Sequence, residues 1–231
     1  MNTLLDLGLL AQAVYGDAGT PGGWSPGTTQ TGRYDFHAAV YTRNGETIVA
    51  FRGTTASAGD AGADLKLGVG MNTSHFGQAM DFMDQYAPGS DVTVCGHSLG
   101  GAMAQVVGNR RELKFATFNA PGVAIVASRN LGELGATALT GTAVVRGAFS
   151  VVSAVFHPVQ AYQDVRATFN TARGVNVCLN ADVVSRIGVH YGAVVRIPGT
   201  GYSPLSQHSI DTVVGVLRTN PVGSLTIDNY I

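Results

Sequence analysis

Apolar residues near the start of the chain recur at helical spacing. Four of them fall on one face of a helix: Leu4, Leu7, Ala11 and Val14. This pattern predicts an amphipathic first helix that packs on a core. A signal peptide is the less favoured interpretation, because Asp6 interrupts the apolar run and no basic segment precedes that run.

Short apolar runs bounded by turn residues predict the strands. Residues 38–42 and 46–51 flank Asn44-Gly45, a dipeptide typical of the tight turn of a β-hairpin. Further strands are predicted at 91–95, 114–119, 174–179 and 193–197, and helices at 74–86, 99–111 and 206–218.

The order of these elements predicts an α/β fold. Strands that alternate with helices form mostly parallel sheets with helices on both faces, and we expect one such domain over residues 1–231. Residues 16–31 and 53–70 are rich in small and turn-forming residues and are predicted as loops. The Ala- and Val-rich stretch 123–171 is interpreted as crossover helices or as a cap over a site.

Composition excludes several classes of protein. Hydrophobic residues make up 45% of the chain and charged residues only 13%, a balance that excludes a disordered chain. The net charge is −1, and the basic residues include only two lysines, so neither a nucleic-acid surface nor a polybasic membrane patch is expected. No apolar run is long enough for a transmembrane helix. Low charge suits a secreted protein, but no export signal is readable, so the compartment stays open.

A candidate nucleophile lies between a predicted strand and a predicted helix. Residues 96–100 read Gly-His-Ser-Leu-Gly and fit the pattern G-x-S-x-G. A nucleophile elbow needs this context, because its strand-to-helix turn is so tight that small residues must flank the serine. The turn also brings Ser98 to a helix N-terminus, which favours a developing negative charge. Ser98 is the predicted nucleophile; a glycine-rich turn with an idle serine is the plainer alternative.

A nucleophilic serine needs a base to remove its proton and an acid to orient that base. After a nucleophile elbow the chain order is Ser, then Asp or Glu, then His. Asp182 follows the predicted strand 174–179, and His208 follows 193–197. Both fall at the carboxyl edge of a parallel sheet, where sites in open α/β sheets form. We therefore expect Asp182 as the acid and His208 as the base.

Other acids and histidines fit this order less well. Asp164 follows no predicted strand. Asp211 lies only three residues after the expected base and is better interpreted as a charge at the start of a helix than as the acid that orients the base. His157 precedes Asp182 and so breaks the chain order. His190 is the main rival base, because it lies eight residues after Asp182 and before the last predicted strand.

The negative charge of an acyl-transfer intermediate requires backbone donors, which form an oxyanion hole. One donor is the N–H group of the residue after the nucleophile, here Leu99, and the other comes from an earlier strand–loop junction. Residues 51–55 occupy that junction. Gly53 lets the backbone approach closely, and Thr54 can offer both its N–H group and its hydroxyl.

Together these motifs resemble the fungal-type class 3 lipases of the α/β-hydrolase superfamily, from about residue 4 to residue 218. The motifs follow the family's order: Phe51-Arg-Gly-Thr54, Asp64-Leu65, His75-Phe-Gly77, Gly96-His-Ser-Leu-Gly-Gly-Ala102, Asn119-Ala-Pro-Gly122, Asn180-Ala-Asp-Val-Val184 and His208. The resemblance implies Ser98, Asp182 and His208 as catalytic residues. It also implies Thr54 and Leu99 as oxyanion donors, with Asp64 supporting the Thr54 hydroxyl.

Two features set this chain apart from the fungal members. Where those members carry a lid with an aromatic residue, residues 55–63 hold no large apolar side chain. We therefore expect a site largely open in water, unless residues 144–156 supply another cover. Cys95 and Cys178 are predicted on strands about 10 Å apart, beyond disulfide reach. The chain thus resembles bacterial or phage-encoded members more closely.

The sequence predicts a serine-dependent carboxylic ester hydrolase. The expected substrates are acylglycerols or short- to medium-chain esters, including lipids at an interface with water. A phospholipase A1 that acts on membrane lipids is the alternative, and an inactive hydrolase scaffold is a third reading. The chemistry requires no metal or organic cofactor, and the motifs typical of dinucleotide, P-loop and zinc sites are absent from the sequence. The oligomeric state stays open.

Overall fold

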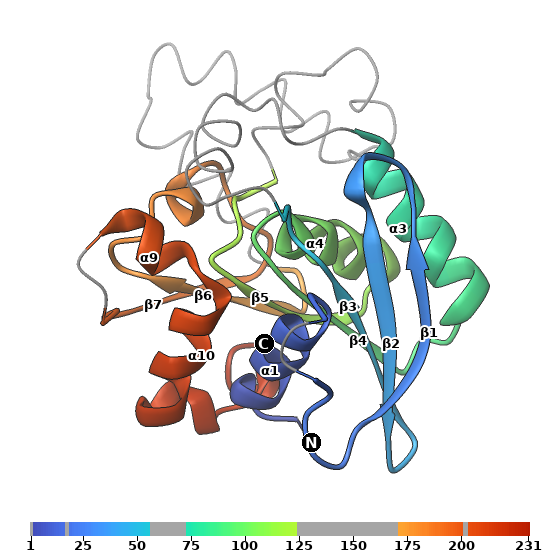
Figure 1. Cartoon of the computed structure of the whole chain (residues 1–231), viewed down its shortest axis with the longest axis horizontal. Coiled ribbons are helices and arrows are strands. Elements are labelled where there is room, and N and C mark those ends of the chain that lie inside the picture. The colour runs from blue at the N-terminus through green and yellow to red at the C-terminus, as the bar shows by residue number, and fades with distance from the viewer. Residues whose placement is uncertain (1, 17–18, 56–72, 124–170, 201–202) are drawn as a thin grey trace.

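The computed structural model describes residues 2–16, 19–55, 73–123, 171–200 and 203–231, and within these ranges seven strands form one sheet (Figure 1). Their order in space is their order in the chain: β1 (Ser25–Thr31), β2 (His37–Arg43), β3 (Glu46–Phe51), β4 (Val92–His97), β5 (Lys114–Phe118), β6 (Gly174–Leu179) and β7 (Ala193–Ile197). The pairs β1–β2 and β2–β3 are antiparallel, and β3 to β7 run parallel.

Helices cover both faces of this sheet. Helices α1 (Leu4–Ala13) and α10 (Ile210–Thr219) pack on one face, and α3 (Thr73–Tyr86) and α4 (Leu99–Arg111) pack on the other. Because successive strand residues point to opposite faces, Ile48 belongs to the first core and Val49 to the second. The prediction of an α/β fold with a mostly parallel sheet is confirmed.

The hairpin and the first helix form as their local sequences predict. Asn44 and Gly45 both adopt positive φ values, as the tight turn between β2 and β3 requires. Helix α1 begins with a capping box in which Thr3 and Asp6 satisfy each other's backbone N–H groups. The four apolar residues predicted to face the core from this helix region are buried: Leu4, Leu7, Ala11 and Val14.

Two predictions of secondary structure were wrong. Strand β1 lies in the segment predicted as a loop, because it is an exposed edge strand of Ser, Thr, Gln, Pro and Gly without apolar alternation. The predicted closing helix 206–218 is two helices, α9 (Pro204–His208) and α10. Ser209 between them leaves the helical conformation and caps α10 through its side chain, so His208 ends one helix instead of lying inside another.

Both cysteines are free and buried. Cys95 lies on β4 and Cys178 on β6, and β5 lies between these two strands, as predicted. Among the helices of the described ranges, none is long and apolar enough to span a bilayer.

Candidate active site

Ser98 occupies a sharp turn between β4 and α4. Its φ of 56° and ψ of −126° lie in a region that non-glycine residues rarely adopt, as expected for the strained turn of a nucleophile elbow. Two glycines allow the turn to close. A Cβ atom on Gly96 would overlap the backbone of Gly100, and one on Gly100 would overlap the carbonyl group of Phe51. The elbow therefore packs directly against the end of β3.

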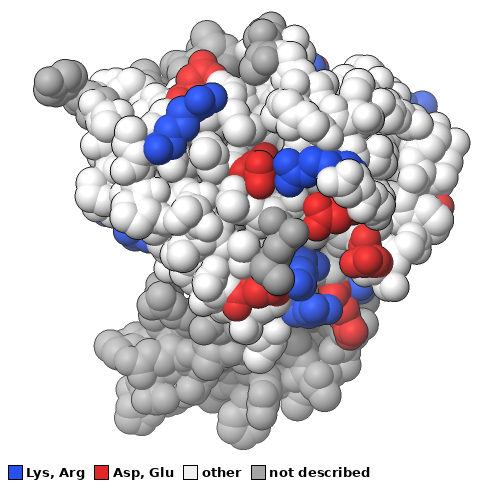
Figure 2. Space-filling view, turned by 90° about the horizontal axis from the view of Figure 1, so that it is seen from below, with Lys and Arg blue, Asp and Glu red and all other residues white. Residues whose placement is uncertain are grey.

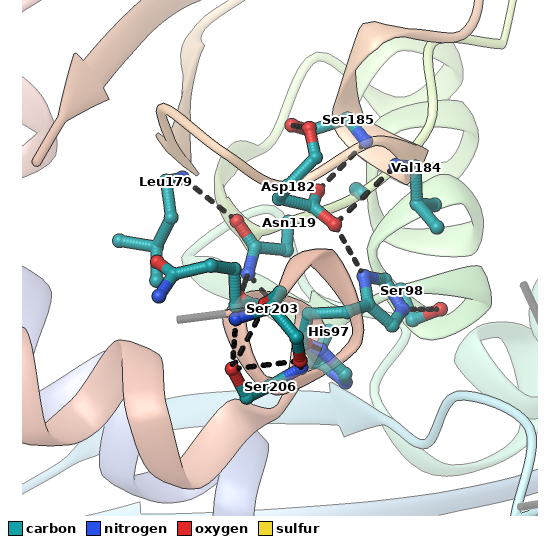
Figure 3. Close-up of polar contacts among 12 residues, drawn as sticks. His97, Ser98, Asn119, Leu179, Asp182, Val184, Ser185, Ser203 and Ser206 are labelled. Carbon is teal, nitrogen blue, oxygen red and sulfur yellow. Dashed lines mark hydrogen bonds and ion pairs between the residues drawn. The ribbon is translucent and has the colours of Figure 1, made fainter. Parts of the chain in front are cut away.

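The hydroxyl of Ser98 begins a chain of hydrogen bonds that ends at a buried carboxylate (Figure 3). Ser98 Oγ lies 2.8 Å from Nε2 of His208, and Nδ1 of the same ring lies 2.9 Å from Oδ1 of Asp182. A carboxylate only accepts, so Nδ1 of a neutral His208 carries the proton and Nε2 is free to accept one from the serine. All three side chains are buried. The structure thus brings together the serine predicted from the G-x-S-x-G motif and the acid and base predicted from chain order.

Asp182 is held in place by the turn that follows β6. Its carboxylate accepts the backbone N–H groups of Val184 at 3.3 Å and Ser185 at 2.8 Å, at the start of the 3₁₀ helix η2 (Val184–Arg186). Burial raises the pKa of Asp182, but the hydrogen bond and charge of His208 and the bonds from Ser185 outweigh burial. The pKa therefore lies below its ordinary value, and the carboxylate is ionised at neutral pH.

Two backbone segments approach Ser98 where oxyanion donors are needed. Leu99 is the first residue of α4, so its N–H group has no partner within the helix. Gly53 lies just after the end of β3 and packs against the elbow. A Cβ atom on Gly53 would lie only 3.0 Å from Cβ of Ser98. Thr54, which is half-buried, comes next in the chain. Thr54 and Leu99 thus belong to the two segments that meet at the serine.

A relay of hydrogen bonds connects Gly53 to the backbone of His208. The Gly53 N–H group donates to the hydroxyl oxygen of Tyr15 at 3.0 Å, and this oxygen lies 2.9 Å from Nδ1 of His97. On the other side of the ring, Nε2 of His97 lies 2.6 Å from the carbonyl oxygen of His208. The relay therefore joins the candidate oxyanion segment to the end of α9, which carries the candidate base.

The chemistry of the relay assigns one arrangement of its protons. A carbonyl oxygen only accepts, so Nε2 of His97 donates to His208. Burial and the neighbouring His208 lower the pKa of His97 to about 3, so the ring is neutral and its Nδ1 accepts from the Tyr15 hydroxyl. The oxygen of Tyr15 then remains free to accept from Gly53. Every group in the relay is satisfied by this single arrangement.

Asn119, which follows β5, supports the same end of α9. Its Nδ2 atom donates to the carbonyl oxygen of Gln207 at 2.7 Å, while its Oδ1 atom accepts the N–H group of Leu179 at 2.8 Å. Sequence reasoning assigned no role to Tyr15, His97 or Asn119. The resemblance did single out the motifs that contain His97 and Asn119, but only the fold shows which backbone groups they bind.

The rival residues are placed elsewhere or lie outside the described ranges. His190 binds the carbonyl oxygen of Ala120 through Nε2, at 2.8 Å. Asp211 lies in the first turn of α10, as a helix-start charge, and accepts from Gln12. Three further residues fall outside the described ranges: Asp64, His157 and Asp164. The predicted lidless segment 55–63, beyond Thr55, and the alternative cover 144–156 also fall outside them.

Within the described ranges, no group of three or more His, Cys, Asp or Glu side chains is placed to hold a metal ion. The arrangement at Ser98 instead contains a hydroxyl, an imidazole and an ionised carboxylate in hydrogen-bonding order. Such an arrangement can transfer an acyl group through a covalent intermediate.

Comparisons with known proteins assign this chain to a family through one family model. Lipase II from Rhizopus niveus is similar in structure, with a TM-score of 0.39 and 15% sequence identity over 78% of this chain and 72% of that chain. A search of curated proteins found no significant match. The model of a phospholipase-like family, described as a Tle-like phospholipase domain, matches residues 6–203. Membership in the class 3 lipases stays a prediction. Since the matched residues make up most of the chain, the protein belongs to the Tle-like phospholipase domain family, which supports an activity on lipid esters.

Proposed function

We propose that this protein is a serine-dependent phospholipase that hydrolyses a carboxylic ester bond of a phospholipid. The observation that carries the proposal is the continuous chain of hydrogen bonds from Ser98 through His208 to Asp182. Such a chain serves acyl transfer, which makes the acyl ester the bond to be cleaved, in preference to either phosphodiester bond. Membership in a phospholipase family supports a phospholipid as the substrate.

In the first half of the reaction, Ser98 Oγ attacks the ester carbonyl carbon while Nε2 of His208 takes the serine proton. The N–H groups of Leu99 and Thr54 stabilise the negative charge on the former carbonyl oxygen. The tetrahedral intermediate then collapses, and His208 returns the proton to the leaving alcohol, a lysophospholipid. Asp182 stays ionised and stabilises the charged imidazole.

In the second half, water attacks the acyl group on Ser98. His208 removes one proton from this water and then gives it back to the oxygen of Ser98, so the enzyme returns to its starting state. The second product is a free fatty acid. The two halves together consume one phospholipid and one water and release a lysophospholipid and a fatty acid.

Product analysis tests this proposal. Purified protein is incubated with phosphatidylcholine, triacylglycerol and p-nitrophenyl esters, and the products are separated by mass spectrometry. We expect fatty acid and lysophosphatidylcholine in equal amounts, at a rate at least tenfold above that on triacylglycerol. Release of phosphocholine or phosphatidic acid would contradict acyl-ester cleavage. Preference for triacylglycerol or for p-nitrophenyl esters would favour the lipase or esterase reading instead.

The nucleophile is tested by the same assay with Ser98→Ala. Because the serine starts the covalent step, we expect kcat to fall by roughly 10⁵-fold with the fold intact by circular dichroism. A folded Ser98→Ala protein that kept a tenth of the activity would remove Ser98 from this role.

A further inference from the structure

The loop between β1 and β2, residues 32–36, lies at the same edge of the sheet as Ser98. It leads into β2, whose Ala38 pairs with Phe51, and Phe51 pairs in turn with Gly96, two residues before the serine. A side-chain bond ties the loop to the oxyanion segment, because the Thr55 hydroxyl donates to Asp35 at 2.8 Å. Figure 1 shows this connection at the upper ends of β1 and β2.

The loop is held in a conformation that L-residues rarely adopt. Tyr34 and Asp35 have φ values of 58° and 62°. Side chains of α3 hold this backbone: Gln78 accepts the Arg33 N–H group at 2.7 Å and donates to its carbonyl oxygen at 3.2 Å. His75 Nε2 lies 2.8 Å from the carbonyl oxygen of Tyr34. Strain fixed by several contacts is a common property of functional loops.

This backbone presents an aromatic ring to the outside of the protein. The side chain of Tyr34 is 63% exposed, which is the largest exposure among the large apolar side chains of the described ranges. Arg33 beside it is also exposed. The neighbouring acid does not neutralise Arg33 directly, since the Asp35 carboxylate binds Arg52 at 2.5 Å and Thr55. Tyrosine and arginine are residues that favour the boundary between lipid and water.

The opposite edge of the sheet has a different chemistry. The amino ends of the parallel strands surround a pocket lined by charges of both signs: Glu46, Asp91, Lys114, Arg173 and Asp228. Lys114 and Asp228 form an ion pair at 2.6 Å. Figure 2, a view from below, shows Lys and Arg side chains interspersed with Asp and Glu on this side of the molecule. Mixed, paired charges of this kind favour water over a lipid surface.

We infer that the Arg33-Tyr34 loop contacts the surface of the phospholipid bilayer that supplies the substrate. The Tyr34 ring lies at the level of the head groups, and Arg33 binds the phosphate of an anionic lipid. Contact at this loop turns the edge that carries Ser98 toward the membrane. The inference rests on the proposed function, because it assumes that the substrate is a membrane phospholipid.

Vesicle binding tests the inference without catalysis. All variants are made in a Ser98→Ala background, so no lipid is consumed, and binding to vesicles of phosphatidylcholine and phosphatidylglycerol is measured by co-sedimentation. Tyr34→Asn removes the ring, and asparagine tolerates the left-handed backbone of this position. We expect it to weaken binding by about threefold to tenfold, because burial of an aromatic ring at the interface is lost.

Tyr86→Asn is the matched control. Tyr86 is 36% exposed and ends α3 ahead of β4, at the edge away from Ser98, so its loss should leave vesicle binding within about twofold of the parent.

Arg33→Gln should weaken binding about threefold on vesicles with phosphatidylglycerol and not on phosphatidylcholine alone. Arg218→Gln, at the far end of α10, controls for loss of charge.

Three results would overturn the inference: the parent does not bind vesicles, Tyr34→Asn binds them as tightly as the parent, or Tyr86→Asn loses as much vesicle affinity as Tyr34→Asn. A second readout uses the active enzyme on vesicles and on dissolved dihexanoylphosphatidylcholine. Tyr34→Asn should lower the vesicle rate at least threefold more than the rate on dissolved lipid, and equal losses contradict surface contact. If the protein binds vesicles through Tyr34 but cleaves neither substrate, the membrane contact is supported and the proposed function is refuted.

Discussion

At the scale of single residues, the site depends on hydrogen bonds with an assigned direction. His208 receives the serine proton at Nε2 only if Asp182 holds the other proton at Nδ1. We expect Asp182→Asn to lower kcat by roughly 10³–10⁴-fold, because the amide favours the wrong tautomer of the imidazole. Steady-state kinetics on a phospholipid measure this loss.

The histidine assignment has a matched comparison within the chain. His208→Ala should cost about as much kcat as Ser98→Ala, since the two act as a unit, whereas His190→Ala should cost less than about tenfold. The two histidines are equally buried, so a loss caused by unfolding would be similar for both. A larger loss in His190→Ala than in His208→Ala would transfer the role of base to His190.

Tyr15 links the candidate oxyanion segment to the candidate base, so loss of its hydroxyl should affect kcat and leave KM almost unchanged. Tyr15→Phe leaves the Gly53 N–H group and Nδ1 of His97 without partners. We expect kcat to fall by about 10- to 100-fold. Tyr41→Phe, which deletes the hydroxyl of a buried core tyrosine, should leave kcat within about twofold. Equal effects of the two variants would reduce Tyr15 to a packing role.

His97 should make the stability of the fold depend on pH. Its folded pKa of about 3 lies below the ordinary value of 6.5, so between these values the unfolded chain binds one more proton. The free energy of unfolding therefore falls as pH drops below about 6.5, by up to about 1.4 kcal/mol per pH unit. His97→Gln, which keeps a donor for the His208 carbonyl, should show a shallower slope in urea unfolding at several pH values. An unchanged slope would mean that His97 is charged or exposed.

At the scale of elements, the tight turn of the elbow is possible because the backbones of β3 and of the start of α4 are in direct contact, with no side chain between them. A methyl group on Gly100 would overlap the Phe51 carbonyl group, so Gly100→Ala should destabilise the fold by about 2–4 kcal/mol. Gly77→Ala in α3 is the control: open space surrounds that position, and the substitution should stabilise by about 0.5–1 kcal/mol. Denaturant unfolding compares the two, and a stable Gly100→Ala protein would contradict the described contact.

The elements that were predicted correctly have a clear pattern of apolar residues in their sequences, and the features that were missed have no such pattern. Strands β6 and β7 coincide with their predicted ranges because both are short apolar runs between turn residues. Strand β1 has no such signal, since its stability comes from pairing with β2 and not from burial. The break between α9 and α10 depends on one serine, which periodicity alone cannot detect.

At the scale of the whole molecule, the nucleophile motif predicted Ser98, and chain order with the rule that parallel strands end at one edge favoured Asp182 and His208. The structure places them within hydrogen-bond distance, while their catalytic roles stay predictions. The relay through Tyr15 and His97 could not be predicted. It joins residues 15, 53, 97 and 208, and only the three-dimensional fold brings such distant segments together.

The two cysteines report on the integrity of the whole fold. Burial raises the pKa of Cys95 and raises that of Cys178 to about 11, so both thiols are protonated and inaccessible in the native state. We expect no reaction with a thiol reagent in buffer and two equivalents in denaturant, with or without prior reductant. Fast labelling of the native protein would contradict the described core.

The role of Ser98 as an activated nucleophile is tested most directly by the site of covalent modification by a fluorophosphonate, which reacts with an activated serine. The protein is treated with the reagent, its intact mass is measured, and the modified peptide is sequenced by tandem mass spectrometry. We expect one adduct per chain, located on Ser98, and none after His208→Ala under the same conditions. An adduct on another residue, or no adduct in a protein that hydrolyses phospholipid, would contradict this role.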